Sequence, residues 1–443
     1  MKNDNIAAIS TAAGAAGVAV IRISGESPLS VAEKLFCPVG KTPVKEFVPN
    51  FMYAGEIDAG DFKDFGLCVY FKAPKSFTGE DTVEFHSHGG VAVSRGILKK
   101  ILASGARLAK NGEFTRRAFL NGKLSLASSE GLIDMINAES AAGVKAGYSL
   151  YREKLTKDVT EMQELLTAAL SQIDAVMDFP EEGLEETSEE AVINALCAVI
   201  EKTDALLATF KTGSRVKNGV KVGIVGKPNV GKSSLLNAVL GFDKAIVSDE
   251  AGTTRDVVEG TLDISGVKFF LSDTAGIREA EGIESFGVEL SKKALNENDV
   301  LLFLVEAGDI TEEDEEVYRL CKDKNVLFVV NKTDKNDKTD GRADICVSAR
   351  TGEGIEELKR LLYERTVGDT DLNGDFLCEE RHYEALSRAK ESLLSAKRAV
   401  ATEPLDVIAI DITAGWQALG EITGKTASED IIDDIFSRFC VGK

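Results

Sequence analysis

Residues 220–240 read VKVGIVGKPNVGKSSLLNAVL. The apolar run 220–225 predicts a buried strand and residues 234–240 predict a helix, so the loop GKPNVGKS lies between a strand and a helix. In such a loop, backbone N–H groups point at phosphate oxygens, the side chain of Lys232 reaches the terminal phosphates, and the Ser233 hydroxyl is placed for Mg²⁺. The stretch therefore predicts a nucleotide-binding phosphate loop.

Three later segments indicate which nucleotide is bound. They are Asp273-Thr-Ala-Gly276, Asn331-Lys-Thr-Asp334 and Ser348-Ala-Arg350. The runs 300–306 and 326–330 are typical of buried parallel strands, so the second segment lies at a strand's carboxyl end, where such sheets bind ligands. A carboxylate at Asp334 accepts from both N1–H and N2–H of guanine, a pair that adenine does not offer. Asp273 is placed to hold Mg²⁺ through water, with the Gly276 N–H near the γ-phosphate. The four segments together favour a GTPase domain over a chance NKxD turn.

The residue that follows Asp273-Thr-Ala-Gly276 departs from the Ras-like pattern. Ile277 stands where a glutamine orients the attacking water in Ras-type enzymes. The candidates to replace it are Arg278, Glu279, Glu281 and Glu284; for any one of them alone, a solvated acidic loop is the simpler interpretation. No arginine is clearly aimed at the transition-state charge, unless Arg255 or Arg278 supplies it. A bound monovalent cation is an alternative, with Asn229 as an oxygen donor.

Composition limits the remaining possibilities. The chain has 443 residues, enough for two or three domains, and its net charge of −21 argues against broad attraction to nucleic acid. Residues 1–123 carry 16 Lys and Arg against 12 Asp and Glu, a net charge of +4, which leaves −25 for the rest. Seven scattered cysteines suit a reducing compartment. No leader or membrane-spanning run is recognised, so we expect a cytoplasmic protein.

Periodicity predicts a multidomain fold. Residues 1–120 mix strands and helices and predict an α+β domain; residues 121–213 and 379–443 predict an all-α domain; residues 216–377 predict an inserted α/β P-loop GTPase domain of the Ras-like class. Each helical stretch has an apolar stripe and no other partner, so we expect the two to pack on each other. Residues 212–215 and 368–375 are expected to be linkers, and domains joined in this way usually move relative to each other.

Several motifs resemble those of the MnmE (TrmE) tRNA-modification GTPases. The matching segments are DEAGTTRD (249–256), GKPNVGKSSLLN (226–237), FCVGK (439–443), FTGED (77–81), HGG (88–90) and GEFTRRAFLNGK (112–123). The resemblance covers essentially the whole chain. It implies a GTPase that works with the FAD-dependent protein MnmG, as a heterotetramer, to add an aminomethyl or carboxymethylaminomethyl group to C5 of the wobble uridine of certain tRNAs. The one-carbon unit comes from a tetrahydrofolate derivative, 5-formyl or methylene.

The resemblance also implies site residues. The N-terminal domain would bind the folate through Arg22, Glu84, Lys123 and Lys443, and would make the protein a homodimer. GTPase domains would dimerise around K⁺, held by Asn229, Ser248, Glu250 and Thr253, with Ser233 and Thr254 on Mg²⁺. Glu284 would orient the water, with Glu281 kept as the alternative because this loop is one residue short. The residues expected to contact GTP are Asn229, Val230, Gly231, Lys232, Ser233, Ser234, Ser248, Thr253, Thr254, Asp273, Thr274, Ala275, Gly276, Asn331, Lys332, Asp334, Ser348, Ala349 and Arg350.

Two questions stay open at the level of sequence. Cys440 is either a nucleophilic or redox thiol, activated by Lys443 or Arg438, or a small hydrophobic residue packed near the folate pocket. The chain is also compatible with a GTP-regulated ribosome-assembly factor of the Era or EngA type, although the acidic helical segment speaks against an RNA-binding domain.

Overall fold

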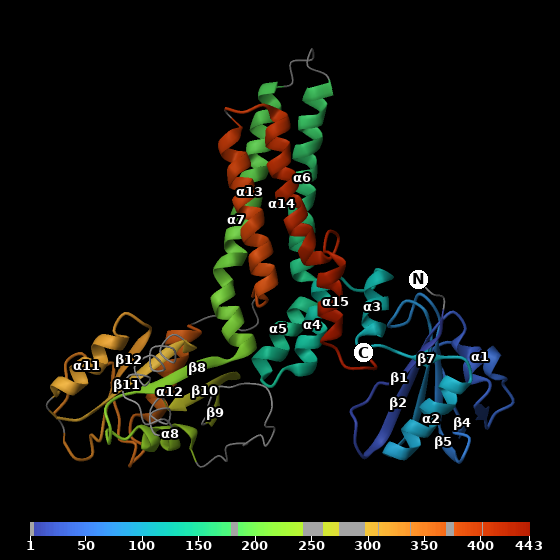
Figure 1. The fold of residues 1–443 in the computed structure, drawn as a ribbon, viewed down its shortest axis with the longest axis horizontal. Coiled ribbons are helices and arrows are strands. Elements are labelled where there is room, and N and C mark those ends of the chain that lie inside the picture. Colours follow the sequence, from blue (N-terminus) through green and yellow to red (C-terminus); the bar gives the residue numbers. More distant parts are fainter. Residues whose placement is uncertain are drawn as a thin grey trace. The chain divides into compact units, whose positions relative to one another are not determined.

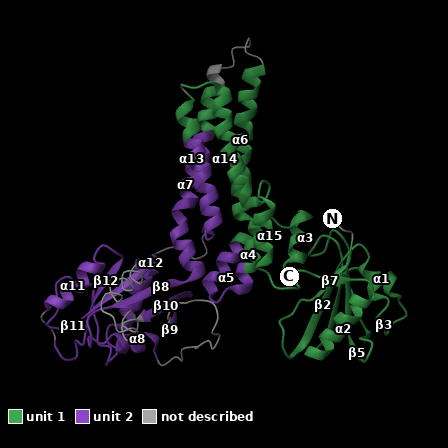
Figure 2. Cartoon of the chain, viewed as in Figure 1, with its two compact units in different colours: residues 1–133, 150–195, 395–443 green, residues 134–149, 196–394 purple. Residues whose placement is uncertain are grey.

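The computed structural model describes residues 4–178, 185–241, 260–273, 297–308, 310–336, 338–368, 376–400 and 402–443 (Figure 1). The chain divides into two compact units (Figure 2). Unit 1 comprises Met1–Ile133, Leu150–Ala195 and Ser395–Lys443, and unit 2 comprises Asp134–Ser149 and Leu196–Leu394. Across the described residues, no helix has both the length and the apolar character needed to cross a bilayer.

Unit 1 is built on a seven-stranded sheet with the order β3-β4-β5-β6-β2-β1-β7. The strands are β1 (Ile6–Ile9), β2 (Ala16–Gly25), β3 (Phe36–Pro38), β4 (Met52–Asp58), β5 (Lys63–Phe71), β6 (Asp81–Gly89) and β7 (Arg107–Leu108). All neighbours are antiparallel except β1 and β7. The expected α+β class is confirmed for residues 1–120, but the sequence missed the edge strands β3 and β7 and the seven-residue inner strand β4.

Alternation along the strands separates the two faces of this sheet. Ala7 of β1 joins the core that α1 (Pro28–Ala32), the short η1 (Val44–Glu46) and α2 (Val91–Ala103) cover. Ile6 and Ala8, on the other face, pack with Phe114 of α3 (Glu113–Leu120). The period of two therefore leaves one face for the core and turns the other toward α3.

Helices complete both units. They are α4 (Leu126–Asn137), α5 (Ala141–Tyr151), α6 (Lys154–Asp178), α7 (Glu185–Asn218), α13 (Glu380–Ala399), α14 (Leu405–Thr423) and α15 (Glu429–Ser437). Within unit 1, α6 packs along α14: Gln163 Nε2 donates to the Trp416 carbonyl at 3.0 Å, and Trp416 Nε1 donates to Thr167 Oγ1 at 3.2 Å. The expected packing between helices that precede and follow the GTPase segment is thus observed.

Unit 2 contains a six-stranded sheet with the order β13-β12-β11-β8-β10-β9. Its strands and helices are β8 (Val220–Val225), α8 (Lys232–Leu240), β9 (Gly260–Ile264), β10 (Val267–Asp273), β11 (Val300–Glu306), α11 (Glu312–Cys321), β12 (Val326–Asn331), β13 (Ile345–Cys346) and α12 (Ile355–Thr366). Only β9 runs antiparallel to its neighbour. Residues of α8 and α12 pack in one core cluster and residues of α11 in another, so the parallel strands are covered on both faces, as the apolar runs predicted.

The prediction that residues 212–215 form a linker was wrong, because these residues lie inside α7. The last turn of α7 is part of the GTPase core: Val216 belongs to its apolar cluster. The buried Arg215 donates from Nε to Asp299 Oδ1 at 2.9 Å and from Nη1 to the Thr366 carbonyl at 2.8 Å. Glycine at 213, read as a turn residue, instead permits close approach, since a Cβ there would lie 2.4 Å from the Leu377 carbonyl oxygen. Residues 369–375 of the second expected linker lie outside the described residues.

A partly buried charge cluster joins α4, the end of α7 and the residue before α13. Lys217 Nζ lies 2.7 Å from Asp134 Oδ1 and also pairs with Glu379. Burial, together with the neighbouring Glu379 charge, raises the pKa of Asp134 to about 7. Two carboxylates thus share one ammonium.

This cluster predicts a pH-dependent stability. Between about pH 4 and pH 7 the folded chain keeps a proton on Asp134 that the unfolded chain releases, so this residue's contribution to the free energy of unfolding falls as pH rises, by at most about 4 kcal/mol. We expect Asp134→Asn to gain thermal stability relative to the wild type as pH is raised through this window. Differential scanning calorimetry of the full chain measures this, with Asp204→Asn, whose pair with Lys390 is half exposed, as the control. Parallel pH curves for the wild type and Asp134→Asn would contradict the assignment.

Candidate functional site

The phosphate loop of unit 2 connects β8 to α8, as predicted. Asn229 and Gly231 both have left-handed backbones, with φ of 65° and 99°. Lys232 is buried, and its Nζ donates to the carbonyl oxygens of Gly226 at 3.0 Å and Lys227 at 3.1 Å. Ser233 and Ser234 follow it on the first turn of α8 with exposed side chains. The loop therefore presents an ammonium, hydroxyls and a helix N-terminus together, which is the donor set for a nucleotide polyphosphate.

The Asn331 side chain links residues 331–334 to the phosphate loop. Its side chain is fully enclosed; Nδ2 donates to the Val230 carbonyl at 3.0 Å, and Oδ1 accepts from the Ala349 N–H at 3.0 Å. A Cβ at position 231 would lie 2.5 Å from Asn331 Nδ2, so only glycine fits there. One amide thus brings three sequence motifs together.

Asp334 and Lys332 are held in defined positions on the same edge. Ser348 Oγ donates to Asp334 Oδ1 at 2.8 Å, and Arg350 Nη1 lies 3.9 Å from Asp334 Oδ2. Lys332 Nζ donates to the Asn229 carbonyl at 2.7 Å and to Glu306 Oε2 at 2.7 Å. The carboxylate keeps acceptor capacity for a ligand while its orientation is set, as bidentate recognition of guanine requires.

The switch residues fall largely outside the described residues. These are Ser248, Glu250, Thr253, Thr254, Arg255, Thr274, Ala275, Gly276, Ile277, Arg278, Glu279, Glu281 and Glu284. Asp273 is the last residue of β10, and its backbone pairs in register with Ile224, two residues before the phosphate loop. The backbone thus brings Asp273 to the nucleotide edge of the sheet.

A second polar site lies in unit 1, on the sheet face toward α3. Arg22 of β2 and Glu84 of β6 are directly opposite in register, and Nε donates to Oε1 at 2.7 Å. The Arg22 guanidinium lies 5.1 Å from the centre of the Phe77 ring and 5.6 Å from that of Phe114. Burial by itself would raise the pKa of Glu84, but contacts with His86 and Arg22 outweigh it and hold that pKa below its usual value. The site therefore offers an ionised acceptor beside a cation and two aromatic rings.

The C-terminal tail docks at this site. The Phe114 N–H donates to the Lys443 carbonyl at 3.2 Å, and Val441 forms a β-bridge with Asn111. Gly442 has φ of 101°, and a Cβ there would lie 2.2 Å from the Ile9 carbonyl oxygen, so glycine is required. The tail is thus fixed to β1 and α3, more than 300 residues away in sequence.

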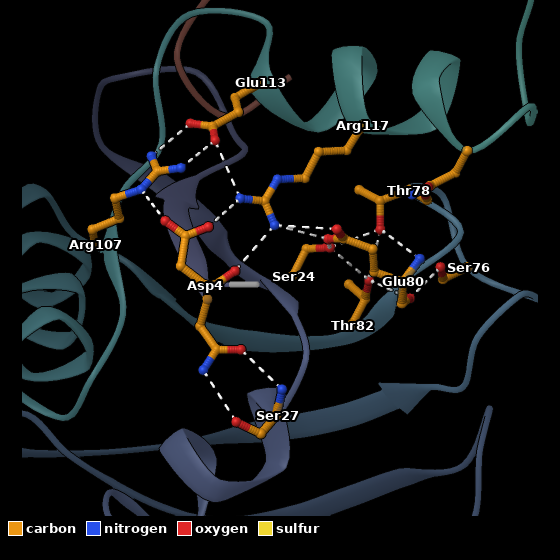
Figure 3. Close-up of polar contacts among 12 residues, drawn as sticks. Asp4, Ser24, Ser27, Ser76, Thr78, Glu80, Thr82, Arg107, Glu113 and Arg117 are labelled. Carbon is orange, nitrogen blue, oxygen red and sulfur yellow. Dashed lines mark hydrogen bonds and ion pairs between the residues drawn. The ribbon is translucent and has the colours of Figure 1, made fainter. Parts of the chain in front are cut away.

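A charge network holds the loop that carries Phe77 (Figure 3). Arg117 of α3 is buried; its Nη1 donates to both oxygens of Glu80, at 3.2 and 3.0 Å, and its Nη2 donates to Asp4 Oδ1 at 2.7 Å. Ser24 Oγ donates to Glu80 Oε2 at 2.8 Å. Because Arg117 satisfies carboxylates from two separate segments, it fixes the loop against α3 and the N-terminus.

Lys123 and Cys440 complete the predicted set. Lys123 Nζ donates to the Pro74 carbonyl at 3.1 Å, and Asn121 Nδ2 donates to the Thr78 carbonyl at 2.8 Å, so both lie against the same loop as Phe77. Cys440 is exposed, and its carbonyl accepts from the Gly112 N–H at 3.5 Å. The structure therefore gathers Arg22, Glu84 and Lys123, together with the tail that carries Lys443, around one loop.

Known proteins that are similar to this chain indicate its family. A family model described as "MnmE helical domain" matches residues 126–440, and one described as "GTP-binding protein TrmE N-terminus" matches residues 5–123. Proteins named "tRNA modification GTPase MnmE" from Caldicellulosiruptor saccharolyticus and Desulforamulus reducens are 39% and 40% identical, over 100% of both chains in each case. A third, from Thermoanaerobacter pseudethanolicus, is 39% identical over 99% of both chains.

The chain belongs to the MnmE family of tRNA modification GTPases. It is a GTP hydrolase that acts in tRNA modification, and its fold combines an N-terminal α+β domain, a helical domain and a P-loop GTPase domain. Full-length similarity to MnmE decides against the Era or EngA interpretation.

Sequence reasoning missed several residues of this MnmE-type chain. Phe77 and Phe114 lay inside quoted motifs, but no periodicity indicated that they enclose Arg22. Glu306, which pairs with Lys332, and Asp314, which pairs with Lys227, carried no sequence signal beyond their positions at a strand end and a helix start.

Proposed function

We propose that this chain is a K⁺-activated GTPase that acts with the FAD-dependent protein MnmG. Together they would add an aminomethyl or carboxymethylaminomethyl group to C5 of the wobble uridine of certain tRNAs, using a one-carbon unit from a tetrahydrofolate derivative. The observation that carries the folate part is the tail, residues 440–443, docked on Phe114, whose ring lies 5.6 Å from the Arg22 guanidinium.

The chemistry of this site suits a folate. A pterin ring presents neighbouring N–H donors along one edge, which an ionised Glu84 accepts. The flat ring suits a site with two aromatic side chains, Phe77 and Phe114. The glutamate carboxylates of the folate need cations, which Lys123 and Lys443 supply.

Folate binding is tested by titrating 5-formyltetrahydrofolate into the full chain by calorimetry. We expect Glu84→Gln to weaken binding about tenfold or more, because a charge-assisted acceptor is lost. Glu56→Gln is the matched control, since Glu56 belongs to an exposed pair with Lys63 on the same sheet. Absence of binding by the wild type, or equal affinity of Glu84→Gln and wild type, would overturn the folate proposal.

We propose one site for Mg²⁺ and one for K⁺, with the ligands that the family resemblance implies. Ser233, exposed at the start of α8, fits as a Mg²⁺ ligand together with Thr254 and, through water, Asp273. Asn229 fits as a K⁺ ligand because its backbone is fixed by Lys332; Ser248, Glu250 and Thr253 would complete that set. A K⁺ ion held by these residues would supply positive charge to the transition state, and Glu284, with Glu281 as the alternative, would orient the water.

We also propose the assembly that the family resemblance implies. GTPase domains of two copies would meet around K⁺, and the N-terminal domains would form the homodimer in the cytoplasm. We propose residues 1–120, residues 121–213 with 379–443, and residues 216–377 as the three domains; the last turn of α7, with Val216 in the GTPase core, connects the second to the third. The exposed Cys440 thiol is accessible for chemistry in the single chain, which favours its proposed reactive role over a packed hydrophobic one.

A further inference from the structure

The second residue of the phosphate loop makes a contact that no motif assigns. Lys227 Nζ lies 2.7 Å from Asp314 Oδ2 and 3.0 Å from Thr311 Oγ1. Asp314 is in the first turn of α11, 87 residues downstream, and is only 2% exposed. The loop is therefore tied to a helix that contributes none of the expected nucleotide contacts.

Asp314 is also part of the capping box of α11, and its two carboxylate oxygens differ in their hydrogen bonds. Its Oδ2 accepts from the Thr311 N–H at 3.0 Å, from Thr311 Oγ1 at 2.6 Å and from Lys227. Its Oδ1 is buried and has no hydrogen-bond partner among the described residues. A cap alone does not require a buried carboxylate with one bare oxygen, which is costly.

The ammonium of Lys227 explains why the charge is tolerated. Burial would raise the pKa of Asp314, but the bonds from Lys227 and Thr311 outweigh it and hold that pKa below its usual value. The carboxylate is thus ionised at neutral pH and is paired with the loop lysine. Removing either partner leaves the other charge partly buried and uncompensated.

The backbone of Lys227 links this ion pair to the nucleotide site. The Lys227 carbonyl accepts from Lys232 Nζ at 3.1 Å, beside the Gly226 carbonyl at 3.0 Å. A side chain anchored on α11 restricts this carbonyl, and with it the loop geometry that nucleotide binding needs.

We propose that the Lys227–Asp314 ion pair is a positioning pair for the GTPase reaction, which holds the phosphate loop in its nucleotide-binding form. Neither residue touches the reacting atoms; both act through the loop backbone. Loss of the pair loosens nucleotide binding while leaving the chemical step at saturating GTP largely intact.

The test is the dissociation rate of a fluorescent GDP analogue from the full chain. We expect Asp314→Asn and Lys227→Met each to speed release about tenfold, as for the loss of a charged hydrogen bond, and the double variant to be no faster than either. Lys227→Arg should restore slow release, and turnover at saturating GTP should change less than the affinity for GTP does. Asn at 314 retains an acceptor for the helix cap, so α11 should survive.

Glu315→Gln is the matched control. It removes the same charge from the same turn of α11, but Glu315 pairs with Arg342 instead of the phosphate loop. Release rates of Asp314→Asn and Lys227→Met equal to that of Glu315→Gln would overturn the proposal. Effects that multiply in the double variant would overturn it too, because independent losses of stability behave in that way.

Discussion

Replacing KCl by NaCl at equal ionic strength is expected to slow GTP hydrolysis by this chain about 10²- to 10³-fold, the range found when one transition-state charge donor is removed. The reason is the proposed site at Asn229, where a cation of the right size would supply the charge that no obvious arginine provides. Asn229 is held with φ of 65° and its carbonyl is fixed by Lys332, so its amide is presented from a defined backbone. Phosphate release at saturating GTP and Mg²⁺ measures the effect.

The variant Asn229→Gly sharpens this test. Glycine tolerates the left-handed backbone, so the substitution removes the amide oxygen without adding backbone strain. Asn229→Gly should be slow in both salts, whereas Asn237→Ala, at an exposed position of α8, should keep the difference between them. Hydrolysis by the wild type that is indifferent to the cation would remove the potassium mechanism.

Asp334→Asn is expected to lower the preference for GTP by roughly 10³-fold or more, because a site built to pair with a base edge strongly rejects a mismatched partner. In the structure, Ser348 holds one oxygen of Asp334, so the side chain would read the base from a fixed orientation. An asparagine there offers a donor where guanine also has a donor, and the two repel. Xanthine has an oxygen at that position, so XTP should become the better substrate.

Competition between GTP and XTP in steady-state turnover measures this switch. Asp323→Asn makes the same chemical change at an exposed position of the same domain and should leave the preference unaltered. Retained GTP preference in Asp334→Asn would mean that recognition of the base lies elsewhere.

Local sequence predicted the strand, loop and helix around the phosphate loop well because these elements are adjacent in the chain. The phosphate loop needs one strand, one helix and the glycines between them, and the predicted strands at 220–225 and 300–306 are confirmed with the same bounds. The prediction of a linker at residues 212–215 failed, because a single glycine inside a helix gives the same local signal as a glycine at a helix end. Here the approach of Leu377 and the anchoring of Arg215 keep the helix intact.

The sequence by itself determined that a strand, a glycine loop and a helix follow one another at residues 220–240, and it predicted that Asp334 selects the base, since these features depend on residues close along the chain. The tertiary structure alone decided that Lys227 is anchored by Asp314, that Phe77 and Phe114 enclose Arg22, and that residues 440–443 lie against β1 and α3. The physical reason is that these contacts join residues far apart in sequence. Packing of whole elements brings them together, and no local pattern of apolar and polar residues encodes such a meeting.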